Sequence, residues 1–337
     1  MGVLTKERIR HCNIPIFIPQ KACPHQCIYC NQRYISGQQK APSSEEVKQT
    51  IEKYLSTAEE GTDIQVAFFG GTFTGLDINE QIVYLETVRP YILEGKVQSV
   101  RLSTRPDYIN REILDLLKQY NVTDIELGAQ SLDDEVLEFS ERGHSAEDVT
   151  KASELIKSYD INLGLQMMIG LPKDTLRKSK YTADMIVSLG ADSTRIYPTL
   201  VIDRTLLASL YREGIYNPLD IDTAVNWTKE IYKIFMHNGV KVLRVGLHPS
   251  RDLINGKGYI AGPFHVSFFE LVLTALWKER LEDCIIIKHV DDIVVNPKDI
   301  NYVIGYKSAN YKWMQSLNPN IRIIQSKDIP AGTFQCV

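Results

Sequence analysis

Two hydrophobic periodicities alternate along the first 250 residues, and this alternation constrains the fold more than any other feature. The apolar, β-branched runs expected as strands are 14–19, 64–70, 97–103, 123–129, 161–170, 193–201 and 240–247. The amphipathic segments expected as helices are 43–58, 110–120, 146–159 and 177–190. Six or seven strand–helix units in series predict an α/β chain whose parallel sheet winds into a full or partial barrel. In such barrels, the loops after the carboxyl ends of the strands hold the active site.

The pattern changes near residue 250. Residues 259–281 contain a Gly-Pro turn and continue as an apolar helix. The elements expected after it are a strand at 284–295, helices at 296–305 and 308–317, and a strand at 320–326. We therefore expect a barrel at 1–250, a helical connection at 251–284 and a small α+β C-terminal domain at 285–337.

The composition bounds the compartment and the partners. The chain has 44% hydrophobic and 24% charged residues, as ordinary soluble proteins do. Its net charge of -4 gives no overall signal for nucleic-acid binding, although a local basic face stays possible. The N-terminus lacks the apolar core of a signal peptide, and no run approaches ~18 apolar residues. We therefore expect a cytoplasmic protein without membrane contact, whose scattered Cys12, Cys284 and Cys336 stay reduced and need no special role.

Three of the six cysteines lie within eight residues, just after the first expected strand. Cys23, Cys27 and Cys30 follow the spacing Cys-x3-Cys-x2-Cys, which supplies three thiolates and leaves a metal centre one ligand short. A structural zinc site would complete the set with His11 or His25. A [4Fe-4S] cluster can bind three cysteines and leave one iron open. The lack of a second cysteine pair and the position after a barrel strand favour the cluster, and zinc stays as the alternative.

The cysteine spacing, with Tyr29 before the last cysteine, resembles the signature of the radical S-adenosylmethionine (SAM) enzymes. The resemblance implies a partial (β/α)6-type radical SAM barrel with a small α+β C-terminal domain. It implies that Cys23, Cys27 and Cys30 hold a [4Fe-4S] cluster whose open iron binds the methionine portion of S-adenosyl-L-methionine. In that family the reduced cluster cleaves SAM, and the resulting 5′-deoxyadenosyl radical abstracts hydrogen from the substrate. An electron donor such as flavodoxin or ferredoxin is then a partner.

Motifs after the second and third expected strands match the same family. Gly70-Gly71-Thr72 resembles the glycine motif that contacts the amino group of SAM, and glycine lets the backbone approach a ligand closely. Ser103 and Thr104 stand where related enzymes place a polar residue near the cofactor. Taken alone, a Gly-Gly pair after a strand is typical of an ordinary turn. The order of these motifs along the chain favours the cofactor interpretation.

The fourth and fifth expected strands end in further matches. Gln130 and Arg142 match the glutamine and arginine that contact SAM in the Elongator catalytic subunit and in oxygen-independent coproporphyrinogen oxidase. Gln166 stands where the coproporphyrinogen enzyme has an aspartate, so its expected contact to the ribose departs from the family pattern. Plain structural interpretations also exist: Gln130 as a partner of strand-end backbone groups, Arg142 and His144 as solvated residues, and Tyr29 as packing rather than a shelf for adenine.

The wider resemblance is to the radical domain of the Elongator catalytic subunit, carried by segments such as FIPQKACPHQCIYCNQ, GGTFTGL, STRPDYI and RGHSAEDV. That subunit modifies wobble uridine in transfer RNA (tRNA), using acetyl-CoA bound by a second, acetyltransferase domain. We expect a short form without that domain, because the residues after the barrel are few and lack a glycine-rich pyrophosphate-binding turn. The resemblance therefore implies SAM cleavage and a possible RNA partner, without acetyl transfer.

The C-terminal domain faintly resembles a KH module, whose Gly-x-x-Gly loop clamps a nucleic-acid backbone. The corresponding loop is Gly305-Tyr306-Lys307-Ser308, in which the second glycine is absent. The alternative is a small domain that covers the open side of the barrel. Three functions remain open: a radical SAM enzyme that modifies RNA, with tRNA favoured; a radical SAM enzyme that acts on a small molecule, as in the porphyrin pathway; and a non-catalytic, metal-stabilised RNA-binding protein.

Overall fold

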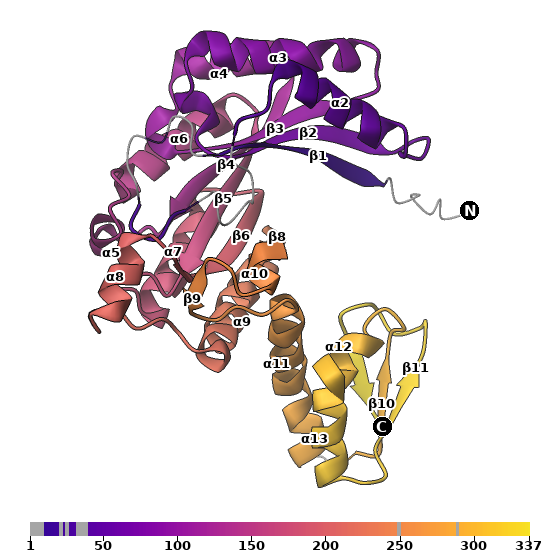
Figure 1. The fold of residues 1–337 in the computed structure, drawn as a ribbon. Coiled ribbons are helices and arrows are strands. Elements are labelled where there is room, and N and C mark those ends of the chain that lie inside the picture. The colour runs from indigo at the N-terminus through magenta and orange to yellow at the C-terminus, as the bar shows by residue number, and fades with distance from the viewer. Residues whose placement is uncertain (1–9, 20–22, 24–26, 32–39, 248–250, 288–289) are drawn as a thin grey trace.

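The computed structural model describes residues 10–19, 23, 27–31, 40–247, 251–287 and 290–337 (Figure 1). Its main feature is a seven-stranded sheet in the order β1-β2-β3-β4-β5-β6-β8, in which every neighbouring pair is parallel. The strands are β1 (His11–Ile18), β2 (Asp63–Gly70), β3 (Ser99–Thr104), β4 (Val122–Gln130), β5 (Asn162–Ile169), β6 (Ser193–Pro198) and β8 (Lys241–Val245). The sheet curls into a half-barrel, which confirms the expected α/β class and partial barrel, here with seven strands.

Helices cover the outer, convex face of this sheet (Figure 1). They are α2 (Ser44–Leu55), α3 (Ile78–Leu93), α4 (Arg111–Gln119), α6 (Ala146–Ser158), α7 (Leu176–Ser188) and α9 (Ile221–His237). The shorter helices α5 (Asp134–Phe139), α8 (Leu206–Arg212) and α10 (Arg251–Ile254) and the single turns η1 (Phe73–Gly75) and η2 (Pro106–Tyr108) follow the carboxyl ends of the strands. Leu102, Leu127 and Leu165 point outward from their strands and are completely buried. Burying one such leucine stabilises the fold by roughly 1.5–3 kcal/mol, so this face holds the main core.

Side-chain caps begin several of the helices, among them α6. The Ser145 hydroxyl accepts from the Asp148 N–H, and the Asp148 carboxylate accepts from the Ser145 N–H at 2.8 Å. Such a cap contributes about 1 kcal/mol. Because α6 begins directly after Arg142 and His144, this cap also holds the segment that carries both residues.

The inner, concave face of the half-barrel is polar. Side chains alternate between the two faces of a strand, so the residues between the buried leucines point inward. The polar side chains that share this inner face at mid-height are Gln65, Arg101, Asp124, Glu126, Gln166 and Arg195. A sheet with an apolar outer face and a polar inner face is suited to bind a polar ligand on its concave side.

The sixth expected strand divides into two elements. Strand β6 ends at Pro198, and β7 (Val201–Ile202) pairs antiparallel with β9 (Tyr259–Ala261). Gly262, with φ +114°, follows β9 so closely that a Cβ there would lie 3.0 Å from the Thr199 carbonyl oxygen. This close approach turns the chain out of the main sheet.

The C-terminal part forms a second, smaller unit. Helix α11 (Phe268–Glu282) leads into a π-helical turn, η3 (Asp283–Ile287), and then into β10 (Asp292–Val295), α12 (Ile300–Ile304), η4 (Tyr306–Ser308), α13 (Ala309–Leu317), β11 (Arg322–Gln325) and β12 (Phe334–Cys336). The three strands pair in the order β11-β10-β12. The strand expected at 284–295 is therefore wrong over its first residues, because the helix continues to Ile287. Strand β12 was not expected, since its three residues give too short a pattern.

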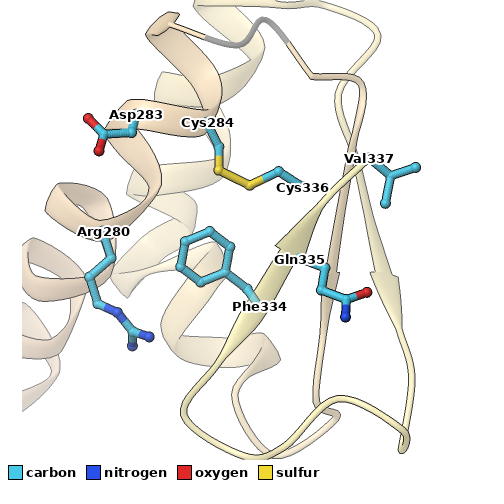
Figure 2. A pocket seen from close by; sticks show the side chains of 7 residues that line it. All are labelled: Arg280, Asp283, Cys284, Phe334, Gln335, Cys336 and Val337. Carbon is cyan, nitrogen blue, oxygen red and sulfur yellow. A yellow bond between two sulfur atoms is a disulfide. The ribbon is translucent and has the colours of Figure 1, made fainter.

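A disulfide links Cys284 to Cys336 (Figure 2). This overturns the expectation that the two residues stay reduced without a special role. The physical reason is tertiary: β12 pairs antiparallel with β10 and places Cys336 opposite Ile293, beside the turn that ends α11. A sequence separation of 52 residues hides this neighbourhood from the sequence alone.

Helix α11 attaches this unit to the barrel. Its Glu279 pairs with Lys233 of α9 at 2.8 Å, and Phe269 packs against the ring of Tyr232. Beyond α11 the small sheet stands away from the half-barrel, so it does not cover the concave face (Figure 1). Within the described ranges, no helix is long and apolar enough to cross a membrane.

Candidate cofactor site at the strand ends

The cysteine loop follows the carboxyl end of β1. Cys27 is buried and Cys30 is half-buried, and the Cys30 N–H donates to the Cys27 carbonyl at 3.0 Å in a tight turn. Cys23 is exposed, and its Sγ lies 3.5 Å from the Thr72 hydroxyl. In the part of the chain that the structure describes, no three metal-ligating side chains already form a group. The three thiolates thus stay a predicted ligand set, which the turn and Thr72 bring toward one edge of the sheet.

The two histidines considered for zinc differ in position. His11 starts β1 and pairs with Asp63 at 2.9 Å, at the amino end of the strand. The cysteines follow the carboxyl end, and an eight-residue strand spans roughly 23 Å at about 3.3 Å per residue. His11 is therefore too distant to complete a zinc site with them. His25 lies outside the described residues.

Arg142 reaches the cysteine loop from the segment after α5. Its Nη1 donates to Cys27 Sγ at 3.0 Å, and its Nη2 donates to the Gly128 carbonyl at 2.6 Å. Arg142 is only 7% exposed, so it is not the solvated residue of the plain structural interpretation. Burial opposes its charge, but Tyr29 and Cys27 outweigh burial and raise the pKa of Arg142 above its ordinary value. A permanent positive charge thus lies against a candidate cluster ligand.

Gln130 ends β4 beside Arg142. Its φ of +67° is unusual for a residue with a side chain, and the register of β4 against β5 shifts just before it. A Cβ built on Gly128 would lie 2.9 Å from Gln130 Nε2 and 3.4 Å from Arg142 Nη2. Both predicted residues therefore converge at Gly128, where the missing side chain leaves room for them.

The glycine motif lies at the end of β2, next to the cysteine loop. Gly70 pairs with Ile18 of β1, and its φ is +111°. A Cβ there would lie 3.1 Å from the Ile18 carbonyl oxygen, so the close approach of the two strands requires glycine. Gly71 follows at the surface of the turn, and Thr72 is buried beneath Cys23.

The two polar candidates after β3 have different surroundings. The Thr104 hydroxyl lies 2.6 Å from the Thr74 hydroxyl inside the buried η1 turn, which makes Thr104 structural. Ser103 points to the inner face, where its hydroxyl accepts from Gln166 Nε2 at 3.5 Å. Gln166 also donates to Glu126 at 3.0 Å. Ser103 and Gln166 therefore lie together on the inner face, deeper in the half-barrel than the strand ends beside the cysteine loop.

Buried polar atoms without hydrogen-bond partners lie in and around Arg142. Tyr29 Oη, Arg142 Nε and His144 Nδ1 are buried and have no hydrogen-bond partner of good geometry among the described residues. Burial raises the pKa of Tyr29 well above its ordinary value, and burial together with Arg142 lowers the pKa of His144 to about 3. Tyr29 and His144 therefore stay neutral at neutral pH. Because buried polar groups are normally satisfied, these three atoms fit a site that a polar ligand completes.

Sequence reasoning missed a set of charges on the inner face, which we name the inner-face ion network: Arg101, Asp124, Glu126 and Arg195. Glu126 is 1% exposed and accepts from Arg101 Nη1 and from Arg195 Nη2, each at 2.9 Å. Burial would raise the pKa of Glu126, but Arg195 and Arg101 outweigh it and lower that pKa. The missed signal was a charged residue at alternate positions inside otherwise apolar strands.

Comparisons with known proteins agree with this geometry. The sequence profile of the Radical SAM superfamily matches residues 17–186, and that of the Radical_SAM C-terminal domain matches residues 191–278. The tRNA uridine(34) acetyltransferase of Dehalococcoides mccartyi is 26% identical over 257 residues, 66% of this chain and 56% of that protein. The heme chaperone HemW of Bacillus subtilis is 28% identical over 200 residues, 57% of this chain and 52% of that protein.

A solved structure has a fold similar to that of this chain. The archaeal Elp3 of Methanocaldococcus infernus superimposes with a TM-score of 0.65 and 22% identity, covering 82% of this chain and 66% of that chain. The chain spans about half the length of the curated relatives named above. Because the profile covers half of the chain and includes the cysteine loop and the ends of the first five strands, the chain belongs to the Radical SAM superfamily.

Proposed function

We propose that this radical SAM enzyme holds a [4Fe-4S] cluster on Cys23, Cys27 and Cys30, cleaves SAM reductively and uses the radical to modify RNA, with tRNA as the substrate. The observation that carries the proposal is the contact between Arg142 and Cys27 within a chain of this superfamily. When bound, the cluster and SAM supply one-electron cleavage of a carbon–sulfur bond. The remaining roles belong to the residues of this chain.

Those residues divide the work by position. Arg142 donates to Cys27 Sγ and, with Gln130, presents polar groups beside the cysteine loop. We assign the contact with the amino group of SAM to Gly70-Gly71-Thr72, whose backbone passes close to β1 at Gly70. We propose that Tyr29 lies against the adenine and that Ser103 and Gln166 contact the ribose. An electron donor such as flavodoxin or ferredoxin is part of the proposal, as is a cytoplasmic location.

RNA as the substrate is supported by the relative named tRNA uridine(34) acetyltransferase. The Gly305–Ser308 loop gives less support than its sequence suggests. The Tyr306 N–H donates to the Thr274 hydroxyl at 2.8 Å, and the Ser308 N–H donates to the Gly305 carbonyl. Two backbone donors that would clamp a phosphate are therefore already used. Any RNA grip by this loop rests on the exposed side chain of Lys307.

Anaerobic reconstitution of the full chain with iron and sulfide tests the cluster and the cleavage. After reduction with dithionite in the presence of SAM, chromatography should show 5′-deoxyadenosine and methionine. Cys27→Ala should lose both the iron and the cleavage, whereas Cys12→Ala, near the opposite end of β1, should lose neither. Stoichiometric zinc without iron in the wild-type protein would contradict the proposal.

Mass spectrometry of nucleosides from cellular RNA, with and without this protein, tests the substrate. The expected result is the loss of one modified nucleoside when the protein is absent. Unchanged RNA beside intact SAM cleavage would favour a second candidate, a small-molecule substrate. The similarity to the heme chaperone HemW is the observation behind that candidate.

A further inference from the structure

A cavity of about 470 Å³ lies at the end of α11, against the last strand of the small unit (Figure 2). The helical side of its wall includes Arg280, Asp283 and Cys284, and β12 supplies Phe334 and Cys336. This volume lies within the range of roughly 300–1,000 Å³ that small-molecule sites occupy. None of the lining residues lies on a strand of the half-barrel, so the cavity is separate from the candidate cofactor site.

Arg280 presents a guanidinium group at one end of this cavity. The guanidinium carbon lies 4.3 Å from the centre of the Trp277 ring and 5.5 Å from that of Phe334. One of its several N–H donors, on Nη2, donates to the Gly332 carbonyl at 2.6 Å. Burial lowers the pKa of Arg280, and the nearby Asp299 opposes that shift. A guanidinium that is held in one orientation and partly removed from water is suited to bind a carboxylate.

Asp283 presents the opposite charge at the other end of the cavity. It is exposed and stands three positions after Arg280, where α11 continues into the turn η3. In the view of Figure 2, the Asp283 carboxylate and the Arg280 guanidinium lie at the two ends, with the disulfide at a level between them. A ligand that spans the cavity therefore meets a cation at one end and an anion at the other.

The Cys284–Cys336 disulfide forms part of the wall between these charges. Cys336 lies two positions after Phe334 on β12, so both side chains face the same side of that strand. Cys336 is half-buried, whereas Cys284 is only 6% exposed. A thiolate that enters the cavity therefore reaches Cys336 Sγ more readily than Cys284 Sγ. Accessible disulfides are the ones that exchange with a surrounding thiol pool.

We propose that this cavity is a thiol–disulfide exchange site for a small peptide thiol that has a carboxylate at one end, an ammonium group at the other and its sulfur between them. Glutathione has this arrangement. Its thiolate forms a bond to Cys336 Sγ, and the Cys284–Cys336 bond breaks. The electron pair of that bond leaves on Cys284 Sγ, which takes a proton from water. One disulfide replaces another, so the exchange needs no further oxidant or reductant, no SAM and no cluster.

Exchange rates of the full, oxidised chain with four thiols test the site: glutathione, 3-mercaptopropionate, cysteamine and 2-mercaptoethanol. Mass spectrometry of peptides follows the mixed disulfide at Cys336 and separates it from reactions of the loop cysteines. Each rate is divided by the rate of the same thiol with a small reference disulfide, which removes differences in thiol reactivity. The corrected rate of glutathione should exceed that of neutral 2-mercaptoethanol about tenfold or more, as expected for charge-assisted contacts. The two singly charged thiols should fall between them.

Two variants assign the ends of the ligand. Asp283→Asn should lower the corrected rates of glutathione and cysteamine several-fold and leave that of 3-mercaptopropionate unchanged. Arg280→Gln should lower the rates of glutathione and 3-mercaptopropionate and leave that of cysteamine unchanged. Glu282→Gln is the matched control, because it removes the same charge one helical position away from Asp283. It should change none of the rates.

Thermal unfolding and the rate with 2-mercaptoethanol check that each variant is folded and keeps its disulfide accessible, because Arg280 also binds Gly332. If Arg280→Gln fails this check, Asp283→Asn supplies the decision: loss of the cysteamine advantage over 2-mercaptoethanol supports the site, and an unchanged advantage overturns it. Equal corrected rates for all four thiols also overturn the site. Because SAM cleavage is measured separately, failure here leaves the proposed function as it stands.

Discussion

Arg142 joins more of the candidate site than any other single residue. It contacts Cys27 and Gly128 directly, and its charge acts on Tyr29 and His144. A buried cation needs partners, because removing it from water costs several kcal/mol. The Cys27 sulfur and the Gly128 backbone carbonyl are such partners here. The stability of the cysteine loop therefore depends on the contact between the Arg142 charge and Cys27.

His144 gives a prediction about pH. Its pKa of about 3 lies far below the ordinary 6.5, because burial and the nearby Arg142 disfavour its proton. The unfolded chain takes up that proton below pH 6.5, whereas the folded chain does not until about pH 3. This contribution to stability is therefore complete above pH 6.5 and is lost as the pH falls toward 3.

Urea unfolding at pH 7 and pH 5 measures the effect. Wild-type protein should lose about 2 kcal/mol more than His144→Gln between these values. His237→Gln, which changes an exposed histidine at the end of α9, is the control and should follow the wild type. The same pH slope in His144→Gln and wild type would mean that His144 takes up its proton in the folded state.

At the scale of elements, the contact of η4 with α11 decides how the small C-terminal unit is built. Gly305 has φ +79°, and a Cβ there would lie 2.8 Å from Thr274 Cγ2 of α11. The Tyr306 N–H and the Asn310 side chain both bind Thr274, through its hydroxyl and its carbonyl. A loop that resembles a nucleic-acid clamp in sequence is thus an internal contact between helices in space.

Gly305→Ala tests that contact. The substitution should destabilise the C-terminal unit by about 1–3 kcal/mol, because it adds both backbone strain and a clash with Thr274. Gly332→Ala is the matched control: its φ is +81°, but nothing lies within 4 Å of the added Cβ. Hydrogen exchange of α12 and α13 is the measurement. Equal effects of the two substitutions would show that strain alone matters and that the η4–α11 contact is loose.

The whole molecule consists of a half-barrel and a small unit that share α11. The Cys284–Cys336 disulfide closes the small unit by tying β12 to the end of that helix (Figure 2). Arg280 supports the same corner, since its guanidinium lies over Trp277 and donates to the Gly332 carbonyl at 2.6 Å. The disulfide therefore restrains the last strand, β12, and does not involve the strand ends of the half-barrel.

Reduction of this disulfide should destabilise the small unit by about 2–4 kcal/mol and leave the half-barrel unchanged, because the bond restricts only the unfolded chain between residues 284 and 336. Limited proteolysis with and without a dithiol reductant measures the effect, with cleavage expected near β12 first. Cys336→Ser should reproduce the reduced pattern in both conditions, and Cys12→Ser should not. Cleavage that begins in the half-barrel would show that the two units unfold together.

The sequence by itself determined the local elements and the kind of chemistry. The order of strands and helices follows from two periodicities, which depend only on neighbours within one turn or one pleat. The cysteine spacing can be interpreted without knowledge of the fold, because three ligands within eight residues must lie in one loop. Gln130 and Arg142 were also predicted, through the resemblance of their segments to those of known radical SAM enzymes.

Only the tertiary structure decided which distant residues meet. Arg195 binds Glu126 across 69 positions of the chain, and this pairing depends on how tightly the sheet curls. Arg244 faces Arg195 only because one residue bulges from β8. Cys284 meets Cys336 only because a three-residue strand joins β10. Register, curl and bulges are set by the packing of the whole sheet, so no local pattern in the sequence encodes them.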